Sequence, residues 1–197
     1  MNTTESPEPR AGLLQRLMAA VVGRKWLSDS WLLQLYPPFW WMRIKVLKLT
    51  ADWSQVRIRL PLTAISRNPG GIMFGGFQAA LADPVPALAC VRRYPQYSVW
   101  TRSMSIDFEL GGHTDLELRF EFSPEQDATI RAQLARDGRA TPTFEYGFYL
   151  ADGRRCTLVR NTVAIRPRGY RPAAVANEAA TPVINEAATP PSTRAAS

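Results

Sequence analysis

The sequence predicts an α+β domain in which an antiparallel sheet wraps around one long apolar helix. The segment from Gly76 to Val91 is rich in alanine and apolar on every side except at Gln78 and Asp83. The segments before and after it alternate apolar and polar residues with a period of two, which is typical of half-buried strands. A helix without a polar face must be buried, so the strands have to cover it with their apolar faces.

Length and composition limit what this fold can do. The chain has 197 residues, 46% hydrophobic and 21% charged, which is typical of one globular domain with a tail. It contains one histidine, His113, and two cysteines, Cys90 and Cys156. Metal sites built from several histidines, CxxC redox motifs, disulfide scaffolds and histidine-based catalytic triads are therefore not expected.

The same features favour a cytoplasmic protein. Glu5 and Glu8 stand where a secretory signal would be basic. No stretch approaches the roughly 18 uncharged apolar residues of a spanning helix. Two cysteines without a disulfide framework fit a reducing compartment.

Residues 1–39 are predicted to form a helical arm. Apolar residues recur at three- and four-residue spacing over 13–22, and a second short helix is expected over 30–36, ended by two prolines. Four tryptophans lie close together here: Trp26, Trp31, Trp40 and Trp41. Such a cluster is typical of a membrane-interface anchor or of an arm packed across a sheet, and we favour packing.

Residues 40–166 form the predicted domain, and residues 167–197 a disordered low-complexity tail. The predicted strands are 44–47, 56–60, 99–110, 116–122, 144–150 and 159–165. In the third of these, Trp100, Met104, Ile106 and Phe108 are expected to share one face. A helix begins at the cap Ser123 and ends at Gly138.

Positive charge is concentrated in one part of the chain. Between Arg43 and Arg102 there are nine basic and two acidic residues, which accounts for the whole net charge of +7. Such an excess favours a polyanion, for example a nucleotide phosphate or an anionic membrane, although a solvated basic face is the commoner explanation. Nucleic-acid binding ranks lowest, because the aromatic and glycine motifs of an RNA module are missing.

The segment Asn68-Pro-Gly-Gly-Ile-Met-Phe-Gly-Gly-Phe-Gln-Ala-Ala-Leu-Ala-Asp83 resembles the hotdog-fold acyl-CoA thioesterases of the phenylacetate-degradation type. In that family an asparagine, a Gly-Gly turn and a helical acid occur in this order. Residues 97–108 are similar to the strand that follows the family's central helix. The likeness extends over about residues 40–165, and it implies a hotdog fold and hydrolysis of an acyl thioester.

The resemblance implies four catalytic roles. The backbone N–H of Gly75 would polarise the thioester carbonyl, assisted by Asn68. Asp83 would activate water or attack the thioester directly, and Thr101 would help to position it. One departure is plain, because Phe74 stands where the family usually has histidine.

The resemblance and the local charge also imply how a substrate would be held. Gly76 and Phe74 flank the polarising glycine, and Arg67 and Arg102 could meet the phosphates of coenzyme A. No metal is implied, and no cofactor other than coenzyme A as part of the substrate. The expected partners are the acyl thioester and a second copy of the chain, with a membrane surface as a further candidate and no nucleic acid.

The second copy is a geometric requirement of this hypothesis. Gly75 and Asp83 lie eight residues apart, which is about 12 Å along a helix axis. Groups acting on one carbonyl must lie within about 3 Å of it. Two antiparallel helices from a two-fold dimer would bring Gly75 of one chain near Asp83 of the other.

Two alternatives remain open. Asp83 followed by Pro84 is also typical of a helix cap with proline at the first helical position, and Asn68-Pro69-Gly70 is ordinary turn chemistry. At the level of function, a non-catalytic acyl-binding or membrane-associated hotdog protein competes with the hydrolase. Phe74, the prolines after Asp83 and the tryptophan-rich arm favour that alternative.

Overall fold

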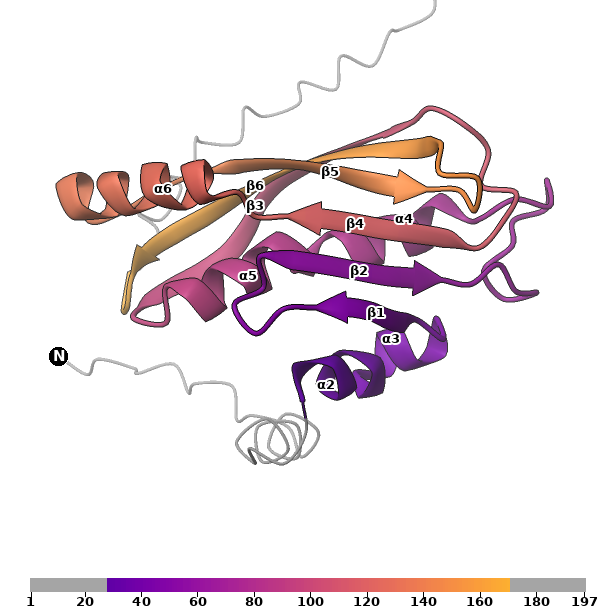
Figure 1. Cartoon of the computed structure of the whole chain (residues 1–197), viewed down its shortest axis with the longest axis horizontal. Helices are drawn as coiled ribbons and strands as arrows, with labels where there is room; N and C mark the ends of the chain where they lie inside the picture. Colours follow the sequence, from indigo (N-terminus) through magenta and orange to yellow (C-terminus); the bar gives the residue numbers. More distant parts are fainter. Residues whose placement is uncertain (1–27, 171–197) are drawn as a thin grey trace, which may run out of the picture.

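The computed structural model describes residues 28–170, and its six strands form one antiparallel sheet in the order β1-β2-β4-β5-β6-β3 (Figure 1). The strands are β1 (Lys45–Leu49), β2 (Gln55–Leu60), β3 (Tyr97–Phe108), β4 (Leu116–Glu121), β5 (Thr143–Tyr149) and β6 (Arg155–Pro167). The helices are α2 (Asp29–Leu35), α3 (Pro37–Trp41), α4 (Gly75–Ala82), α5 (Pro84–Arg93) and α6 (Pro124–Asp137). The α+β prediction is confirmed. The helix predicted over 13–22 and the tail from residue 171 lie outside the described residues.

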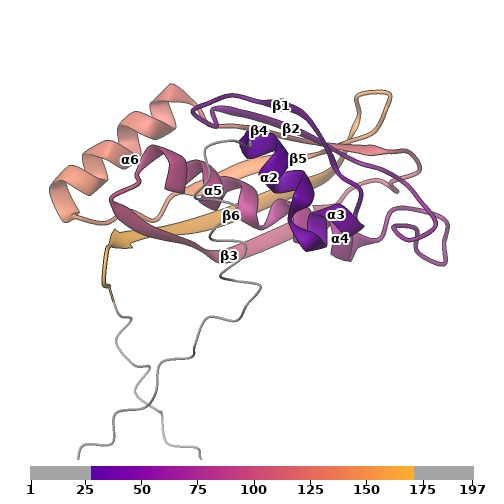
Figure 2. The same cartoon turned by 90° about the horizontal axis from the view of Figure 1, so that it is seen from below.

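The predicted central helix consists of two helices, α4 and α5, which meet at Asp83 and lie against one face of the sheet (Figure 2). The division follows from Pro84 and Pro86. Proline has no backbone N–H, so the carbonyls of Ala80 and Ala82 lose the donors that would continue the helix. The expectation of one long helix therefore needs this correction.

The core lies between the sheet and these two helices. Leu81, Val85, Ala89 and Cys90 are buried on the helix side. The sheet contributes the alternate residues of its central strands: Val56, Ile58, Leu60, Leu116, Leu118, Phe120, Phe144, Phe148, Val159 and Val163. Burying one such side chain contributes about 1.5–3 kcal/mol, so this layer is the main source of stability.

A β-bulge in β3 corrects the predicted faces of this strand. Thr101 pairs with Val163 and Met104 pairs with Asn161, with a register shift just after Thr101. Val163 and Asn161 lie two residues apart in β6, so both point to the face that covers the central helices. The extra residue turns Thr101 toward the helices and Trp100 away from them, and the prediction that Trp100 shares a face with Met104 is wrong.

The arm packs differently from the prediction. Helix α2 lies beside β1, where Gln34 Oε1 accepts a hydrogen bond of 3.2 Å from the backbone N–H of Val46. Leu33 of α2 and Phe39 of α3 are buried. Trp31, Trp40 and Trp41 are exposed, Trp40 to 67%. The preferred interpretation is that the arm packs across the sheet, but these three tryptophans take no part in that packing, because aliphatic and phenyl groups occupy the inner face. Trp26 lies outside the described residues.

Two local predictions are confirmed. Ser123 and Gln126 form a reciprocal capping box at the start of α6, and Gly138 ends that helix with φ 65°.

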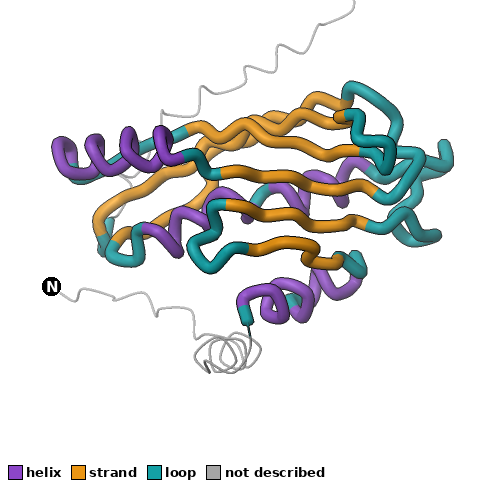
Figure 3. Tube along the Cα trace, viewed as in Figure 1, coloured by secondary structure: helices purple, strands orange, loops and turns teal. Residues whose placement is uncertain are grey.

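The long loop between β2 and α4 lies at the end of the sheet where α4 begins (Figure 3). In the described part of the chain, no helix has the length and apolar character needed to cross a membrane.

Candidate functional site

The loop before α4 folds back as a hairpin and brings the predicted Asn68 segment to the start of the helix. The backbone N–H of Phe74 donates to Ser66 O at 2.7 Å, and Arg67 pairs with Met73 as an antiparallel bridge. A further bond of 2.9 Å from Met73 N to Gly112 O ties the hairpin to the loop after β3. The helix start is thus fixed from two sides.

Gly75 is the first residue of α4, where backbone N–H groups have no helical acceptor. The hydrogen bonds among residues 28–170 include none from the N–H of Gly75 or Gly76. The ring of Phe108 lies directly over Gly75, since a Cβ there would be 2.7 Å from the ring's Cζ. A side chain at this position would displace the Phe108 ring, and the N–H of Gly75 is available for a developing oxyanion.

Asn68 has a structural role in this hairpin. Its Oδ1 accepts a hydrogen bond of 3.2 Å from the backbone N–H of Ile72, and its own backbone N–H donates to Ile72 O at 2.8 Å. The side-chain oxygen of Asn68 therefore stabilises the turn, as the interpretation of Asn68-Pro69-Gly70 as a turn expects. The Nδ2 group is the side-chain donor that remains to face a ligand.

The ring of Phe74 packs against Gly76, where a side chain would leave it no room. Phe74 is 49% exposed and meets Phe77 edge-to-face, with ring centroids 5.9 Å apart. Its ring lies so close to Gly76 that a Cβ at that position would overlap it. Phe74 therefore forms an apolar wall beside the helix start.

Asp83 lies at the junction of α4 and α5 with its side chain exposed. Its backbone is helical, with φ −45° and ψ −54°, and its side chain makes no capping hydrogen bond to α5. Asp83 therefore occupies the N-cap position of α5, with Pro84 at the first helical position as the alternative interpretation expects, but its carboxylate does not cap the helix. Within the described chain the carboxylate has no hydrogen-bond or salt-bridge partner, so it is free to meet a substrate or another chain.

Three buried or half-buried side chains hold the backbone at this junction. Tyr146 Oη donates to Ala82 O at 2.8 Å, while Asn161 Nδ2 and Thr101 Oγ1 each donate to Asp83 O at 3.0 Å. Pro86 cannot donate to Ala82 O, so Tyr146 supplies the missing donor. Burial raises the pKa of Tyr146, which keeps the hydroxyl protonated as that donor. Thr101 therefore contacts Asp83 through its backbone carbonyl and not through its carboxylate.

Tyr146 and Asn161 are the residues that sequence reasoning missed. Pro84 and Pro86 indicate that two helix carbonyls need donors from elsewhere, but no local pattern says which strand supplies them. A second buried pair, Gln78 Oε1 accepting from Thr157 Oγ1 at 2.6 Å, anchors α4 to β6 in the same way. These hydrogen bonds fix the helices relative to the sheet, so the backbone at Asp83 is held in place.

The substitution Tyr146→Phe is expected to lower the free energy of unfolding by about 1–3 kcal/mol, because it leaves the buried Ala82 carbonyl without a donor. Urea denaturation followed by circular dichroism measures this. The control Tyr149→Phe removes a hydroxyl with no hydrogen bond in the described structure and should change stability by less than about 0.5 kcal/mol. Equal stability of the two variants would contradict the supporting role of Tyr146.

One chain does not bring the predicted residues together. Asn68, Gly75 and Phe74 lie at the start of α4, and Asp83 lies with Thr101 at the other end, about 12 Å along the helix. Arg67 and Arg102 are exposed, Arg67 in the hairpin and Arg102 in the β3 bulge. Of the nine basic residues between 43 and 102, Arg57, Arg92 and Arg93 form ion pairs with acidic side chains.

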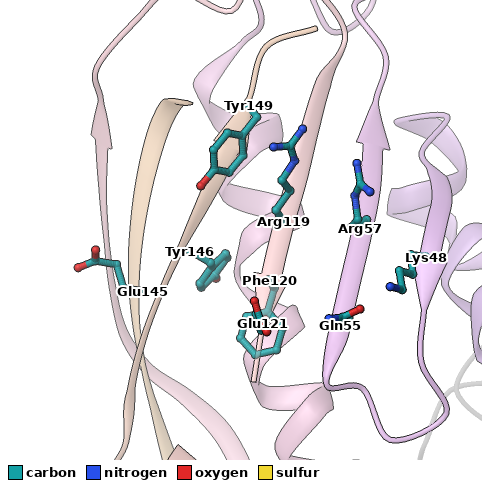
Figure 4. A pocket seen from close by; sticks show the side chains of 9 residues that line it. All are labelled: Lys48, Gln55, Arg57, Arg119, Phe120, Glu121, Glu145, Tyr146 and Tyr149. Atoms are coloured by element: carbon teal, nitrogen blue, oxygen red, sulfur yellow. The ribbon is translucent and has the colours of Figure 1, made fainter. Parts of the chain in front are cut away.

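A hollow on the outer face of the sheet is a less suitable site (Figure 4). It has a volume of about 570 Å³ and lies where β4 and β5 diverge beyond the pair Arg119 and Gly147. Its charges are mixed and largely engaged: Arg57 and Arg119 both bind Glu117, and Arg119 lies 4.4 Å from the centre of the Tyr149 ring. The two arginines are thus partly neutralised by Glu117, and Glu145 by Arg160, which leaves less charge for a ligand.

Comparison with known proteins gives a family and a fold. A family model described as "Domain of unknown function (DUF4442)" matches residues 24–162. No curated protein matches the chain. Among solved structures, a Pseudomonas aeruginosa protein named "Probable Thioesterase" is 16% identical with a TM-score of 0.63, covering 70% of this chain and 93% of its own.

Two further solved structures are similar. A mutant thioesterase from Pseudomonas aeruginosa is 14% identical with a TM-score of 0.55, covering 73% of this chain and 97% of its own. A thioesterase from Haemophilus influenzae is 12% identical with a TM-score of 0.51, covering 67% and 84%. At this level of identity the likeness establishes the fold, and the expected hotdog architecture is confirmed.

Proposed function

Because this chain belongs to the DUF4442 family and has the hotdog fold of thioesterases, we propose that it hydrolyses an acyl thioester as a homodimer. The observation that carries the proposal is the pair of free groups on the central helices. The carboxylate of Asp83 is exposed and unpaired on a rigid junction, and the N–H of Gly75 is free at the helix start.

The proposed reaction uses these groups from two chains. Asp83 of one chain accepts a proton from water as general base, and the water oxygen attacks the thioester carbon. The N–H of Gly75 and Nδ2 of Asn68 from the other chain stabilise the negative charge on the carbonyl oxygen. The C–S bond then breaks, and the thiolate leaves and takes up a proton. In the alternative form, Asp83 attacks the carbon itself and water hydrolyses the resulting anhydride.

The edge strand β3 supports a dimer. It has twelve residues and pairs with β6 on one side only, so its other edge presents free backbone groups. A long, unprotected edge of this kind is a template for pairing with another chain. Pairing β3 with its copy would place two sets of central helices side by side. We propose this arrangement for the shared site, with Arg67 and Arg102 available for the phosphates of coenzyme A.

A non-catalytic acyl-binding protein is the second candidate. Phe74 favours it, because an exposed phenyl ring stands at the helix start, where it can hold an aliphatic chain but cannot donate a hydrogen bond. The exposed Trp31, Trp40 and Trp41 favour a membrane-associated form of the same protein. Both forms predict acyl binding without release of a thiol.

The test is release of coenzyme A from acyl-CoA thioesters of increasing chain length, followed with a thiol reagent. We expect hydrolysis well above the uncatalysed rate for at least one chain length. Light scattering during size-exclusion chromatography should give the mass of a dimer or of a dimer of dimers. An active monomer would contradict the shared site, and acyl binding with no thiol release would favour the second candidate.

A further inference from the structure

We propose that a groove between the N-terminal arm and α5 binds the aliphatic chain of the acyl group. The groove has a volume of about 520 Å³, within the range of sites that take small organic ligands. Leu32, Leu35 and Tyr36 line it from the arm, and Pro84, Leu88 and Val91 line it from α5. We call it the arm groove. The proposal deepens the proposed function, because it names the substrate as a thioester with an extended aliphatic chain.

The arm groove reaches the residue that follows the candidate catalytic Asp83. Pro84 forms part of its wall and follows Asp83 directly in the chain. Pro84, Leu88 and Val91 recur at spacings of four and three, so they lie along one face of α5. From Pro84 to Arg92 the helix advances about 12 Å, and Figure 2 shows α2 lying across this helix. A chain whose carbonyl sits at Asp83 would thus run along α5 under the arm.

The far end of the arm groove is held by a strained turn. Trp53 lies in the turn between β1 and β2 with φ 57°, a left-handed backbone that is unfavourable for a bulky residue. The turn is held because the indole is buried and its Nε1 donates to Asp29 Oδ2 at 2.9 Å. Arg92 Nε donates to Ala51 O at 3.1 Å, which ties α5 to the same turn. The wall that Trp53 forms is therefore built into the fold.

The chemistry of the lining selects an apolar occupant. Asp29 and Arg92 are its two charged residues, and they lie 3.9 Å apart and already bind Trp53 and Ala51. Most of the lining is aliphatic or aromatic and offers a polar ligand no hydrogen-bond partner in place of the water that it would lose. An aliphatic chain loses nothing and buries apolar surface of both partners. The charged pair also sets a length limit, because a longer chain would run into it.

The test uses S-alkyl coenzyme A thioethers, from ethyl to hexadecyl, as ligands that cannot be hydrolysed. Isothermal titration calorimetry on the full chain should give a Kd that falls about fourfold for each added methylene, which is the effect of burying one CH₂. The fall should stop where the chain reaches Arg92. A Kd independent of chain length would overturn the proposal, since it would mean that the chain stays in water or that another part of the protein fills the groove.

Two variants and a control locate the binding. Val91→Trp puts a large ring into the arm groove at a position that is 45% exposed, so the fold should tolerate it. Leu47→Trp is the control on β1, 44% exposed and outside the lining. Val91→Trp should raise the Kd of the long thioethers about tenfold or more and leave the Kd of the ethyl compound unchanged. Leu35→Glu, in the opposite wall, should do the same. No difference from Leu47→Trp would overturn the proposal.

These measurements separate the arm groove from the catalytic proposal. Chain-length-dependent binding that Val91→Trp removes would support the groove even if no thioester were hydrolysed. If kcat/KM and Kd were both the same for every chain length, the proposed hydrolase activity would be supported and the proposal that the arm groove binds the chain would be overturned.

Discussion

The substitution Asp83→Asn should lower kcat for thioester hydrolysis by about 10²–10⁴-fold, the usual contribution of a general base. Asparagine has nearly the same size and cannot accept a proton from water. The Asp83 carboxylate has no partner in the described chain, and its backbone is held by Tyr146, Asn161 and Thr101. The variant should therefore fold with a stability within about 0.5 kcal/mol of the wild type.

The measurement is the steady-state rate of coenzyme A release at saturating substrate, with binding of a thioether analogue as a second readout. Binding should be unchanged, because the lost interaction belongs to the transition state. Asp137→Asn is the matched control at the end of α6, where the acid is paired with the neighbouring Arg136. It should have wild-type activity. If Asp83→Asn hydrolysed as fast as Asp137→Asn, Asp83 could be neither base nor nucleophile.

The substitution Gly75→Pro should have the second-largest effect, a loss of about 10²–10³ in kcat relative to Gly75→Ala. Proline removes the backbone N–H that would bind the oxyanion, whereas alanine keeps it. Both add a Cβ that displaces the Phe108 ring, so this disturbance cancels in the comparison. Proline is tolerated at the first helical position, and Phe74, with φ −67° and ψ 124°, has the extended backbone that precedes proline.

Mixing the two inactive variants tests whether the site is shared. In a dimer of one Gly75→Pro chain and one Asp83→Asn chain, one of the two sites combines an intact Gly75 with an intact Asp83. Random exchange of chains should therefore restore about a quarter of the wild-type activity. Each variant alone should stay inactive. A mixture that gains nothing, although mass spectrometry shows mixed dimers, would mean that Gly75 and Asp83 do not act across the interface.

The elements of the fold were largely predictable because they follow from local patterns. The alternation in β2, β4 and β5, the capping box at Ser123 and the prolines after Asp83 are each visible within a few residues. The segment from Asn68 to Asp83 identified the family type, since its glycines and acid stand at fixed spacings. Its separation of eight residues led to the proposal of one site shared by two chains, and the structure keeps Gly75 and Asp83 at opposite ends of α4.

The hydrogen bonds that hold the backbone around Asp83 were not predictable from the sequence. Tyr146 and Asn161 lie more than sixty residues after the carbonyls that they bind. The β-bulge after Thr101 reverses the faces of β3, and one extra residue in a regular alternation leaves no distinct signal. The exposure of the tryptophans of α2 and α3 was not predictable, because composition does not say which residue of an amphipathic helix meets the sheet.

The sequence by itself determined the order and the approximate positions of the strands and of most helices, and which carboxylate and glycine are candidates for chemistry. These follow from backbone sterics, side-chain periodicity and the missing N–H of proline, which act between near neighbours. The tertiary structure alone decided which side chains satisfy the broken helix, that the carboxylate of Asp83 is free, and that the arm and α5 enclose a groove. Those outcomes depend on contacts between distant segments, which a linear pattern does not record.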